Sequence, residues 1–575
     1  MKIILGINAL HSDSSACIIK NGELVCALEE ERLNRKKHTS QFPIMAINEC
    51  LKISQVSIDS ITDIAINGNP KSNLWQKIFF ILKNINIKKN NQFYERFKSK
   101  NNLKNLICEK LNIKSNIKFH HIEHHISHIA SAYFPSNFNK TNALSIDGSG
   151  DFVSLVIAEC DNQKIKITDK IYFPNSLGIF YQAMTQFIGF KNYGDEYKIM
   201  GLASYGKPIY FDKIKNNIFK DTINFFELNQ KFFNHSNISF NYRNKFLEVI
   251  NDIYNEKLNY LFKDDIENAD NLEIFKKNFA SSTQKTFEFF FEKILNYISK
   301  KKFSNNLVYA GGCALNSSAN NILISKKYFN NFYIPVAPGD NGGAIGAALL
   351  VNSKYNTNCK NTSNPYLGCS YNDTDIEQAI NSKFKNFIKF QKFNNMLETC
   401  EMASDMLSKG KVLGWFQEKM EFGPRALGNR SILADPRNPE MKNIINSKIK
   451  RRESFRPFAP SVLKEFQNEW FIGHYNNEYM SSVMVVKENK KNLIPAVVHY
   501  DGTSRAQTVT KNKNLIYYTL IQLFYQKTKV PILLNTSFNE NEPMIMKPLE
   551  AIDCLVRTEL DGLFINNYFI KKNDS

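Results

Sequence analysis

A similar arrangement of short apolar runs occurs twice along the chain, and this repetition constrains its fold more than any other feature. The runs lie at residues 2–7, 15–20 and 23–28 in the first block, and at 143–146 and 152–159 in the second. Asn21-Gly22 between two of them is a hairpin signal. Glycine turns and helical segments follow both blocks. The pattern therefore predicts a duplicated α/β domain with a nucleotide-binding cleft between its halves.

The length of 575 residues exceeds what a single hydrophobic core supports, so at least two domains are expected. We expect a first domain over residues 1–355, with helical insertions near 71–119 and 210–300. A polar, turn-rich segment at 356–372 is the expected linker. Residues 373–575 have helices and strands of their own and predict a second α/β domain.

Composition excludes several classes of protein. A hydrophobic content of 43%, with 13% aromatic residues, is typical of folded cores and argues against disorder. The ten cysteines have no C-x-x-C pair, which argues against a zinc ribbon and favours a reducing, cytoplasmic location. Polar residues interrupt the first apolar run, so no signal peptide is expected. No run approaches the ~20 apolar residues of a membrane span.

The net charge of +19 arises from 74 basic and 55 acidic residues. A basic balance suits nucleic acid or an anionic membrane. Because the lysines are spread along the chain, a general compositional bias is the favoured interpretation, without a nucleic-acid partner. The Lys-rich and Asn-rich segment 71–119 contains an amphipathic stretch at 74–87. It is either a basic membrane-surface helix or, as we favour, an insertion that packs its Phe/Ile face onto the domain.

Histidines are concentrated at one place, with five of the ten within residues 120–128. His124 and His128 are four residues apart, so a helix presents both imidazoles on one face. Asp147 and Asp340 each lie where an apolar strand runs into a glycine-rich loop. Either aspartate alone would serve equally well as a turn or cap residue. Together the four residues predict a site for a divalent first-row metal, with Fe(II) first and Mn, Zn or Mg as alternatives.

Glycine turns suggest where a nucleotide is held. Gly311 and Gly312 precede a helix in a segment that reaches Asn316, where backbone amides and the helix dipole favour phosphate. A similar turn occurs at 339–343. Lys198 lies among charged residues in the glycine-flanked segment 194–202, which is a further candidate for the same cleft.

Four polar patches in the second domain combine arginine with glycine, proline, serine and threonine. They cover residues 421–431, 448–460, 501–509 and 535–539. A solvated helical face explains them poorly, whereas the planar guanidinium suits phosphate oxygens. The patches predict a phosphate-rich ligand.

At these residues the chain resembles the NodU/CmcH-type O-carbamoyltransferases over nearly its whole length. The resemblance is carried by residues 6–16, 29–32, 123–132, 201–206 and 311–316, together with the four C-terminal patches. It implies a duplicated actin/hexokinase-like (ASKHA) N-terminal domain and a YrdC-like C-terminal domain. It also implies carbamoyl phosphate and ATP as substrates, with carbamoyl-adenylate as the intermediate. The carbamoyl acceptor would be a hydroxyl group of a small molecule or glycan.

Transferred to this chain, the resemblance implies a role for each candidate residue. The implied metal ligands are His124, His128, Asp147 and Asp340. The implied catalytic residues are His11, Lys198 and Arg452, with His11 as general base for the acceptor hydroxyl. Nucleotide and carbamoyl phosphate contacts fall on Gly311, Gly312, Asn316, Arg425, Arg430, Lys450, Arg456, Arg505 and Asn535. One departure is Asn541, where the family usually has glycine before Glu-Pro.

Two other functions stay open at this point. An enzyme of the tRNA threonylcarbamoyl type would account for the basic charge. A non-catalytic nucleotide-binding scaffold is the second, although the metal-type cluster and the arginine patches together argue against it. The acceptor, the metal and the oligomeric state, including a homodimer, are likewise left open by the sequence.

Overall fold

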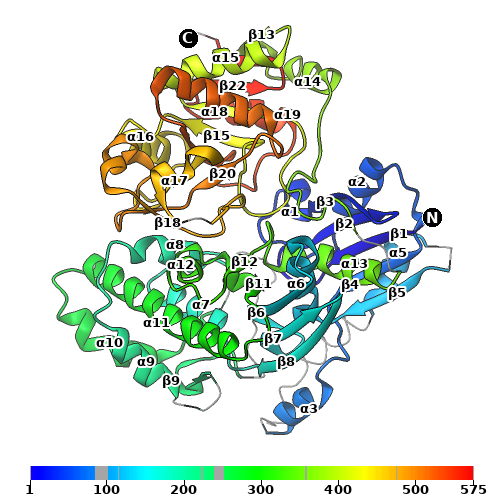
Figure 1. The fold of residues 1–575 in the computed structure, drawn as a ribbon, viewed down its shortest axis with the longest axis vertical. Coiled ribbons are helices and arrows are strands. Elements are labelled where there is room, and N and C mark those ends of the chain that lie inside the picture. Colours follow the sequence, from blue (N-terminus) through cyan, green and yellow to red (C-terminus); the bar gives the residue numbers. More distant parts are fainter. Residues whose placement is uncertain are drawn as a thin grey trace. The chain divides into compact units, whose positions relative to one another are not determined.

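A computed structural model of the protein divides into two compact units (Figure 1). The first comprises Met1–Glu30 and His38–Ser363, and the second comprises Glu31–Lys37 and Asn364–Ser575. The structure describes residues 2–83, 102–113, 116–220, 222, 225–237, 251–355, 359–473 and 475–573. The division at Ser363 falls inside the segment expected to be a linker. The short segment Glu31–Lys37 belongs to the second unit although it lies early in the chain.

The first unit contains two five-stranded sheets with the same topology. In each, three consecutive strands form an antiparallel meander, and two later strands add in parallel beside the first strand of the meander. The first sheet, in order β3-β2-β1-β4-β5, consists of β1 Ile3–Asn8, β2 Ser15–Lys20, β3 Glu23–Glu29, β4 Asp63–Asn67 and β5 Lys118–Ile122. The second, in order β12-β11-β6-β7-β8, consists of β6 Lys140–Gly150, β7 Val153–Asp161, β8 Lys164–Tyr172, β11 Asn306–Ala310 and β12 Asn331–Tyr333.

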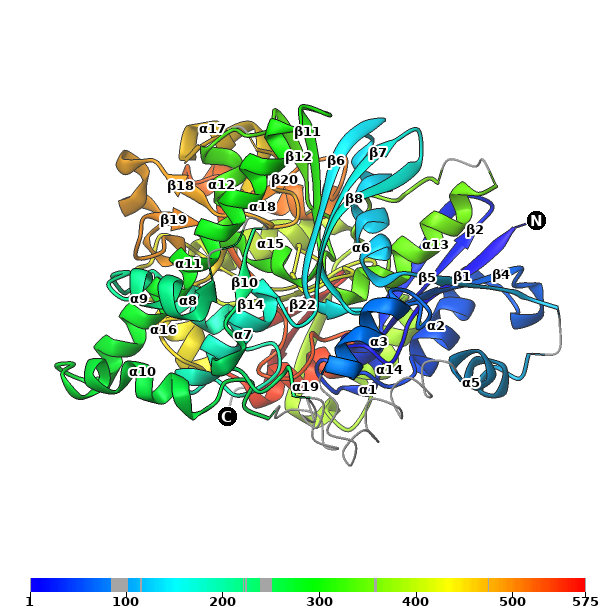
Figure 2. The same cartoon turned by 90° about the horizontal axis from the view of Figure 1, so that it is seen from below.

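Two helices lie side by side between these sheets (Figure 2). Helix α6 (His124–Tyr133) follows the first sheet in the chain but packs on β6 and β11 of the second. Helix α13 (Gly343–Ser353) follows the second sheet but packs on β1, β2 and β4 of the first. Their close approach depends on small residues, since a Cβ at Gly346 would lie 1.8 Å from the carbonyl oxygen of Ser127.

The other elements of the first unit surround the two sheets. They are α2 Ile44–Ser54, α3 Leu74–Lys83, α5 Leu103–Lys110, α7 Leu177–Phe187, α8 Glu196–Ala203, α9 Phe211–Ile218, β9 Phe219–Lys220, β10 Glu227–Leu228, α10 Glu256–Glu267, α11 Leu272–Lys300 and α12 Ser317–Ser325. The described residues between 210 and 300 lie mainly in helices and also form the small β9–β10 ribbon. Helix α11 buries Phe279, Phe287 and Phe291 in the core.

Helix α3 corrects one expectation. The amphipathic stretch at 74–87 was expected to pack its Phe/Ile face onto the domain, and its last four residues lie outside the described part of the chain. Within Leu74–Lys83, Phe80 does pack, on Phe152 and Phe173. Ile78 and Phe79 are exposed. The helix packs with one edge only: residues 76, 77 and 80 turn towards the domain, and most of the apolar side chains turn away.

The second unit is built around an eight-stranded mixed sheet. Its order is β13-β23-β22-β14-β15-β21-β16-β20. The strands are β13 Ile388–Lys392, β14 Leu413–Phe416, β15 Arg430–Ala434, β16 Ala459–Leu463, β20 Gln507–Val509, β21 Ile532–Ser537, β22 Gly562–Ile565 and β23 Tyr568–Lys572. A smaller sheet contains β17 Phe471–Ile472, β18 Met484–Val486 and β19 Thr503–Ser504. Both units therefore have mixed α/β structure, in agreement with the sequence-based prediction.

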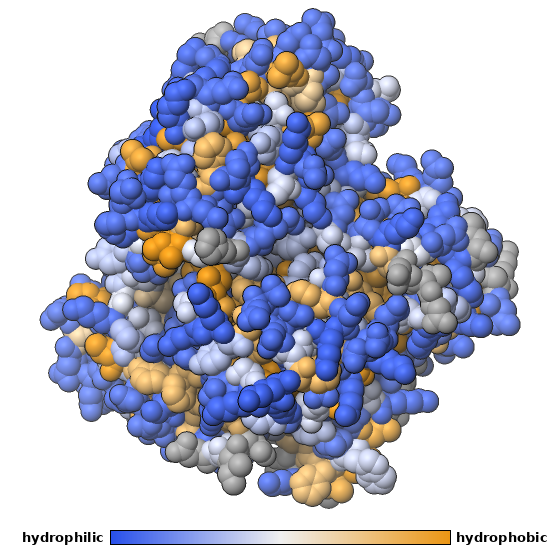
Figure 3. Space-filling view, viewed as in Figure 1, coloured by the Kyte–Doolittle hydropathy of each residue, from blue (hydrophilic) through white to orange (hydrophobic). Residues whose placement is uncertain are grey.

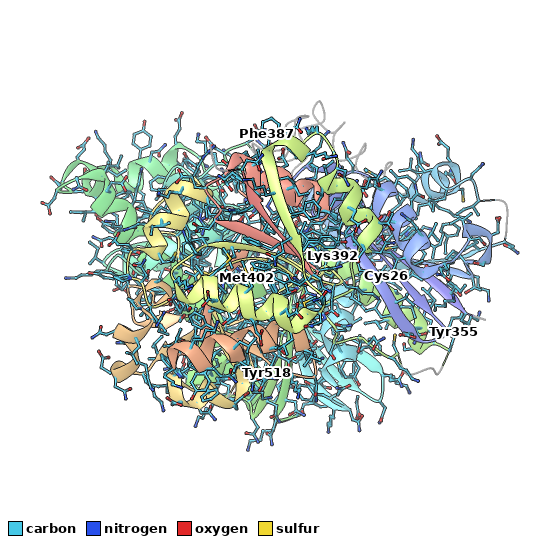
Figure 4. All side chains as sticks on the ribbon, turned by 90° about the horizontal axis from the view of Figure 1, so that it is seen from above. Cys26, Tyr355, Phe387, Lys392, Met402 and Tyr518 are labelled. Carbon is cyan, nitrogen blue, oxygen red and sulfur yellow. The ribbon has the colours of Figure 1, made fainter. Side chains whose placement is uncertain are left out.

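The second unit also contains helices, and those near its C-terminal end contact the large sheet. The helices are α14 Asp373–Ile380, α15 Met396–Ser408, α16 Met441–Ile444, α17 Gln467–Trp470, α18 Leu515–Thr528 and α19 Pro548–Arg557. Helices α15 and α18, which carry the labelled Met402 and Tyr518, pack against each other (Figure 4). Helix α18 in turn contacts β16 and β21. Among the described residues, no helix is long and apolar enough to cross a membrane.

Candidate functional site

Four candidate metal ligands meet in the first unit. The Nε2 atoms of His124 and His128 lie 3.0 Å apart, and each lies within 3.2 Å of Asp147 Oδ2. Asp340 Oδ1 is 3.4 Å from His124 Nε2 and 3.5 Å from His128 Nε2. All four ligand atoms lie within 4.8 Å of one another. Two imidazoles and two carboxylates that converge from three separate segments fit a divalent first-row metal.

The first turn of α6 fixes the two histidines. The Glu123 carboxylate accepts a hydrogen bond from Ile126 N at 3.0 Å and caps the helix. Asp151 Oδ2 accepts another from His124 N at 3.0 Å. The helix then presents His124 and His128 on one face, one turn apart. A Cβ at Gly150 would lie 2.0 Å from the His124 ring, so only glycine leaves room for this imidazole.

The glycine turn at 311–312 orients Asp147. Oδ1 of Asp147 accepts hydrogen bonds from Gly148 N at 2.7 Å and Gly312 N at 3.3 Å, which leaves Oδ2 towards the histidines. Gly311 has φ 90°, and a Cβ there would lie 2.2 Å from the carbonyl oxygen of Ile146. This close approach, in addition to any contact with a nucleotide, requires glycine.

The pKa shifts in this cluster indicate that its carboxylates and imidazoles interact strongly with one another. Burial alone would raise the pKa of Asp147, but hydrogen bonds from His124 and His128 hold it well below its ordinary value. Burial and the neighbouring Asp147 raise the pKa of Asp340. Burial acts to lower the pKa of His128, but its bonds to the two carboxylates outweigh burial and raise it to about 9. Two partly buried carboxylates beside two imidazoles favour a positive charge at this point, and a divalent metal is one group that carries it.

Two other histidines of the 120–128 segment bind protein groups outside the cluster of candidate ligands. His125 Nε2 donates to Val153 O at 2.9 Å while its Nδ1 accepts from Ser145 Oγ at 2.8 Å, and burial lowers its pKa to about 3. This imidazole is a neutral structural group. His120 instead pairs with Asp63 at 2.7 Å, on the first sheet. The i, i+4 spacing was the sequence signal that separated the two candidate ligands from their neighbours.

His11 lies beside the metal-type cluster. Its ring centroid is 4.9 Å from that of His124. The loop that carries it, between β1 and β2, is held by Asn8 Nδ2, which donates to Ser12 O and Asp13 O at 3.0 Å. Leu10 and Asp13 have φ values of 61° and 55°, an uncommon conformation that the asparagine stabilises.

Two further candidates in the first unit already have protein partners. Lys198 Nζ lies 3.1 Å from Asp195 Oδ1. The Asn316 side chain caps α12 through Ala319 N at 3.0 Å and exchanges hydrogen bonds with Gln284. Glu196 lies two residues before Lys198 in the same glycine-flanked segment, and the sequence did not predict a role for it. Burial raises the pKa of Glu196 to about 7.

A group of arginines forms the candidate anion site of the second unit. Burial lowers the pKa of Arg425 to about 10. Burial, together with the charges of Arg425 and Arg452, lowers the pKa of Arg505 well below its ordinary value. Arg452 is oriented by Nε, which donates to Asn446 Oδ1 at 2.7 Å. Partly buried guanidinium groups that repel one another are stabilised by a polyanion.

Arg430 and Lys450, expected as phosphate contacts, instead bind protein oxygens. The guanidinium of Arg430 is fully buried, lies over the Phe416 ring, and donates to the carbonyl oxygens of Gln417, Asn429, Cys369 and Glu418. Lys450 Nζ donates to Ser537 O at 2.5 Å and Asn539 O at 2.7 Å. Their charged groups hold loops in place, and their residue type alone did not reveal this.

Asn535, at β21, has one unusual atom. Its Nδ2 donates to Ala426 O at 3.2 Å and contacts Ser461 Oγ and Gln507 Oε1 at 3.0 Å. Gln507 is itself fixed by donation from its Nε2 to Leu427 O at 2.9 Å. The amide of Asn535 is therefore oriented by its acceptors. Its Oδ1 is buried and has no hydrogen-bond partner in the described part of the chain.

Segment Glu31–Lys37 contributes two arginines to the second unit, and neither was a predicted site residue. Arg32 donates to Gly423 O at 3.0 Å. Arg35 donates to Met544 O at 2.9 Å and Pro543 O at 2.6 Å. The run of charged residues at 29–32 was the only signal, and it did not indicate which unit the segment joins.

Comparison with known families assigns the chain. Residues 3–349 match the family described as carbamoyltransferase N-terminus, and residues 404–572 match carbamoyltransferase C-terminus. The chain belongs to the carbamoyltransferase family. The four metal-type ligands lie in the first matched region and the arginine cluster lies in the second.

Individual relatives of this carbamoyltransferase cover nearly all of it. An uncharacterised protein of Synechocystis is 34% identical over 100% of this chain and 97% of its own length. The nodulation protein NolNO of Sinorhizobium fredii is 33% identical over 98% of this chain and 80% of its own. Among solved structures, full-length HypF in a phosphate- and nucleotide-bound form has a TM-score of 0.32 and 15% identity, covering 61% of this chain and 46% of that one.

Proposed function

We propose that this carbamoyltransferase is an ATP-dependent, cytoplasmic O-carbamoyltransferase that makes carbamoyl-adenylate in its second unit and transfers the carbamoyl group in its first. The observation that carries the proposal is the separation of two chemistries: a cluster of imidazoles and carboxylates in one unit, and a group of partly buried arginines in the other. In this proposal the first unit is an actin/hexokinase-like domain and the second is YrdC-like.

Adenylation requires a site for phosphate groups. Carbamoyl phosphate and water give carbamate and phosphate, and a carbamate oxygen then attacks the α-phosphorus of ATP, releasing pyrophosphate. We assign Arg425, Arg452 and Arg505 to the phosphate oxygens that carry the charge. Arg456, whose guanidinium lies 3.7 Å from Glu453, is a further candidate contact. Charge that develops in such a step is stabilised by donors fixed in advance. Arg430 and Lys450 support the surrounding loops.

Asn535 has a side-chain acceptor atom that the binding of phosphate alone would not require. Its buried Oδ1 is an acceptor with no partner among the described residues, at a cost of about 1–3 kcal/mol unless a ligand satisfies it. Carbamoyl phosphate and carbamate carry an NH2 group, which is the donor that such an oxygen needs. We assign Asn535 to the recognition of this group.

Transfer in the first unit consists of attack by an acceptor hydroxyl on the carbamoyl carbon, with AMP as leaving group. His11 takes the hydroxyl proton, a role that fits its place beside His124. The turn at Gly311 and Gly312 and the residue Asn316 hold the nucleotide. His124, His128, Asp147 and Asp340 would hold a divalent metal, with Fe(II) as first choice. That metal supplies Lewis-acid stabilisation of developing negative charge.

The direct test is to incubate the protein with ATP, carbamoyl phosphate and candidate hydroxyl acceptors, including sugars and natural products. Mass spectrometry should detect the mass gain of one carbamoyl group on an acceptor. If pyrophosphate is released but none of the acceptors is carbamoylated, the result would support the adenylation step and not the transfer step.

Substrate discrimination should depend on Asn535. Acetyl phosphate, which has a methyl group in place of NH2, should support pyrophosphate release at least about 100-fold less well than carbamoyl phosphate, because a buried acceptor is left unpaired. Asn535→Leu should reduce kcat/KM for carbamoyl phosphate and so reduce the difference in pyrophosphate release between carbamoyl phosphate and acetyl phosphate. Ser461→Ala removes a neighbour of Asn535 but keeps Oδ1, so it should preserve the discrimination. Equal use of both acyl phosphates by the unaltered protein would refute this role.

The basic charge leaves tRNA modification as a second candidate function. If the charge is compositional, as we expect, tRNA should bind only weakly at physiological salt, because neutralised phosphates release counterions and affinity falls with ionic strength. Filter binding over a range of salt concentrations measures this. Tight binding that depends on the tRNA sequence at physiological salt would favour the RNA-modifying function.

A further inference from the structure

Helix α3 presents an apolar stripe to solvent. Trp75, Phe79 and Leu82 are 81%, 69% and 62% exposed, and Leu74 and Ile78 are exposed beside them. These positions share one face of the helix. In Figure 3 hydrophobic atoms appear at the lower edge, where Figure 1 places α3. A contiguous apolar face of this kind on a soluble unit marks an interaction surface.

The opposite edge of α3 is firmly attached to the first unit. Phe80 packs on Phe152 and Phe173 at centroid distances of 5.4 and 5.5 Å. Lys77 Nζ donates to Pro70 O at 2.8 Å, and Gln76 Nε2 lies 3.4 Å from Tyr172 OH. The exposed stripe is therefore held outward by packing on its other side.

The attachment of α3 continues to the metal-type cluster. Asn73 Nδ2, at the start of α3, donates to Asp151 O at 3.0 Å. Asp151 Oδ2 accepts from Asn69 N at 2.7 Å and from His124 N at 3.0 Å. Asp151 thus joins the segment that leads into α3 to the first turn of α6, through its backbone oxygen and its carboxylate. A surface that binds α3 is rigidly positioned with respect to the transfer site.

Charge identifies the kind of surface. Between Asp63 and Glu95 the sequence has five lysines and no acidic residue. Lys71 and Lys83, which flank the stripe, are exposed. A second copy of this chain, with a net charge of +19, would bring like charges together at this face. An anionic lipid surface instead satisfies both the apolar side chains and the lysines.

We propose that α3 is an interfacial helix that seats the first unit on an anionic bilayer, with Trp75, Phe79 and Leu82 inserted at the level of the headgroups and Lys71 and Lys83 towards the lipid phosphates. The transfer site is then presented to hydroxyl acceptors at the membrane surface. Binding itself does not depend on the proposed carbamoyl transfer and is measured without substrates.

Sedimentation with vesicles tests this inference. The full chain should pellet with vesicles that contain phosphatidylglycerol and phosphatidylcholine, more weakly with phosphatidylcholine alone, and less at high salt. Trp75→Ser with Phe79→Ser should reduce the partition coefficient at least about tenfold, because affinity follows the apolar area inserted. Tyr260→Ser, at a residue 74% exposed on α10, is the matched control and should bind like the unaltered protein.

Two measurements separate the outcomes. Circular dichroism and pyrophosphate release should be unchanged in the double variant, which shows that loss of binding does not arise from unfolding or from failed adenylation. Light scattering reports the oligomeric state. Vesicle binding that is absent in the unaltered protein, or equal in the double variant, overturns the proposal. A dimer that the double variant dissociates also overturns it and assigns the stripe to a second copy.

Discussion

Arg452→Ala should abolish pyrophosphate release from ATP and carbamoyl phosphate, whereas His128→Ala should leave that release largely intact and block carbamoylation of the acceptor. Arg452 belongs to the partly buried arginine group of the second unit, and His128 to the ligand cluster of the first. Each loss should be on the order of 100-fold or more if the group stabilises charge in the transition state. Pyrophosphate and carbamoylated acceptor are measured side by side for both variants.

The neighbouring Arg451 is a matched control for Arg452. Its guanidinium pairs with Glu540 at 3.2 Å and its side chain is 60% exposed, so Arg451→Ala should keep nearly full pyrophosphate release. The two-site mechanism predicts independent defects. If His128→Ala stops pyrophosphate release as completely as Arg452→Ala, in a protein that is still folded, both steps share one site and the mechanism is wrong.

Metal content should fall from about one divalent ion per chain to near zero in the double variant His124→Ala/His128→Ala. The reason is that both imidazole ligands, which lie 3.0 Å apart, are lost. Chelation of the unaltered protein should have the same effect and should stop carbamoyl transfer. Inductively coupled plasma mass spectrometry of purified protein identifies the metal and its stoichiometry.

Two further variants sharpen this test. Gly150→Ala keeps all four ligands but places a Cβ about where the His124 ring lies, so it should also lower metal content. His120→Gln alters a clustered histidine that pairs with Asp63 and should retain the metal. Full metal content in the double histidine variant would mean that the ligands are assigned to the wrong residues.

Local patterns in the sequence were sufficient for the class of fold and for the metal-type histidines. Alternation and hairpin signals are properties of neighbouring residues, and β1, β2 and β3 follow them closely. The i, i+4 spacing of His124 and His128 likewise requires only a helical segment to place both imidazoles on one face. The family motifs then identified a carbamoyltransferase, because they extend over most of the chain.

Tertiary contacts decided how individual charged and apolar groups are used. Arg430 and Arg505 have the same side chain in similar arginine-rich patches, but four carbonyl oxygens surround the first. The membership of segment 31–37 in the second unit depends on contacts with residues near 423 and 543, hundreds of positions away.

The exposure of the apolar stripe on α3 depends in the same way on which edge of the helix packs on Phe152 and Phe173. An amphipathic pattern states that a helix has an apolar face, but the fold determines whether that face is buried. Burial and hydrogen bonding depend on the partners that the folded chain brings together, and those partners are not encoded in the local spacing of residues.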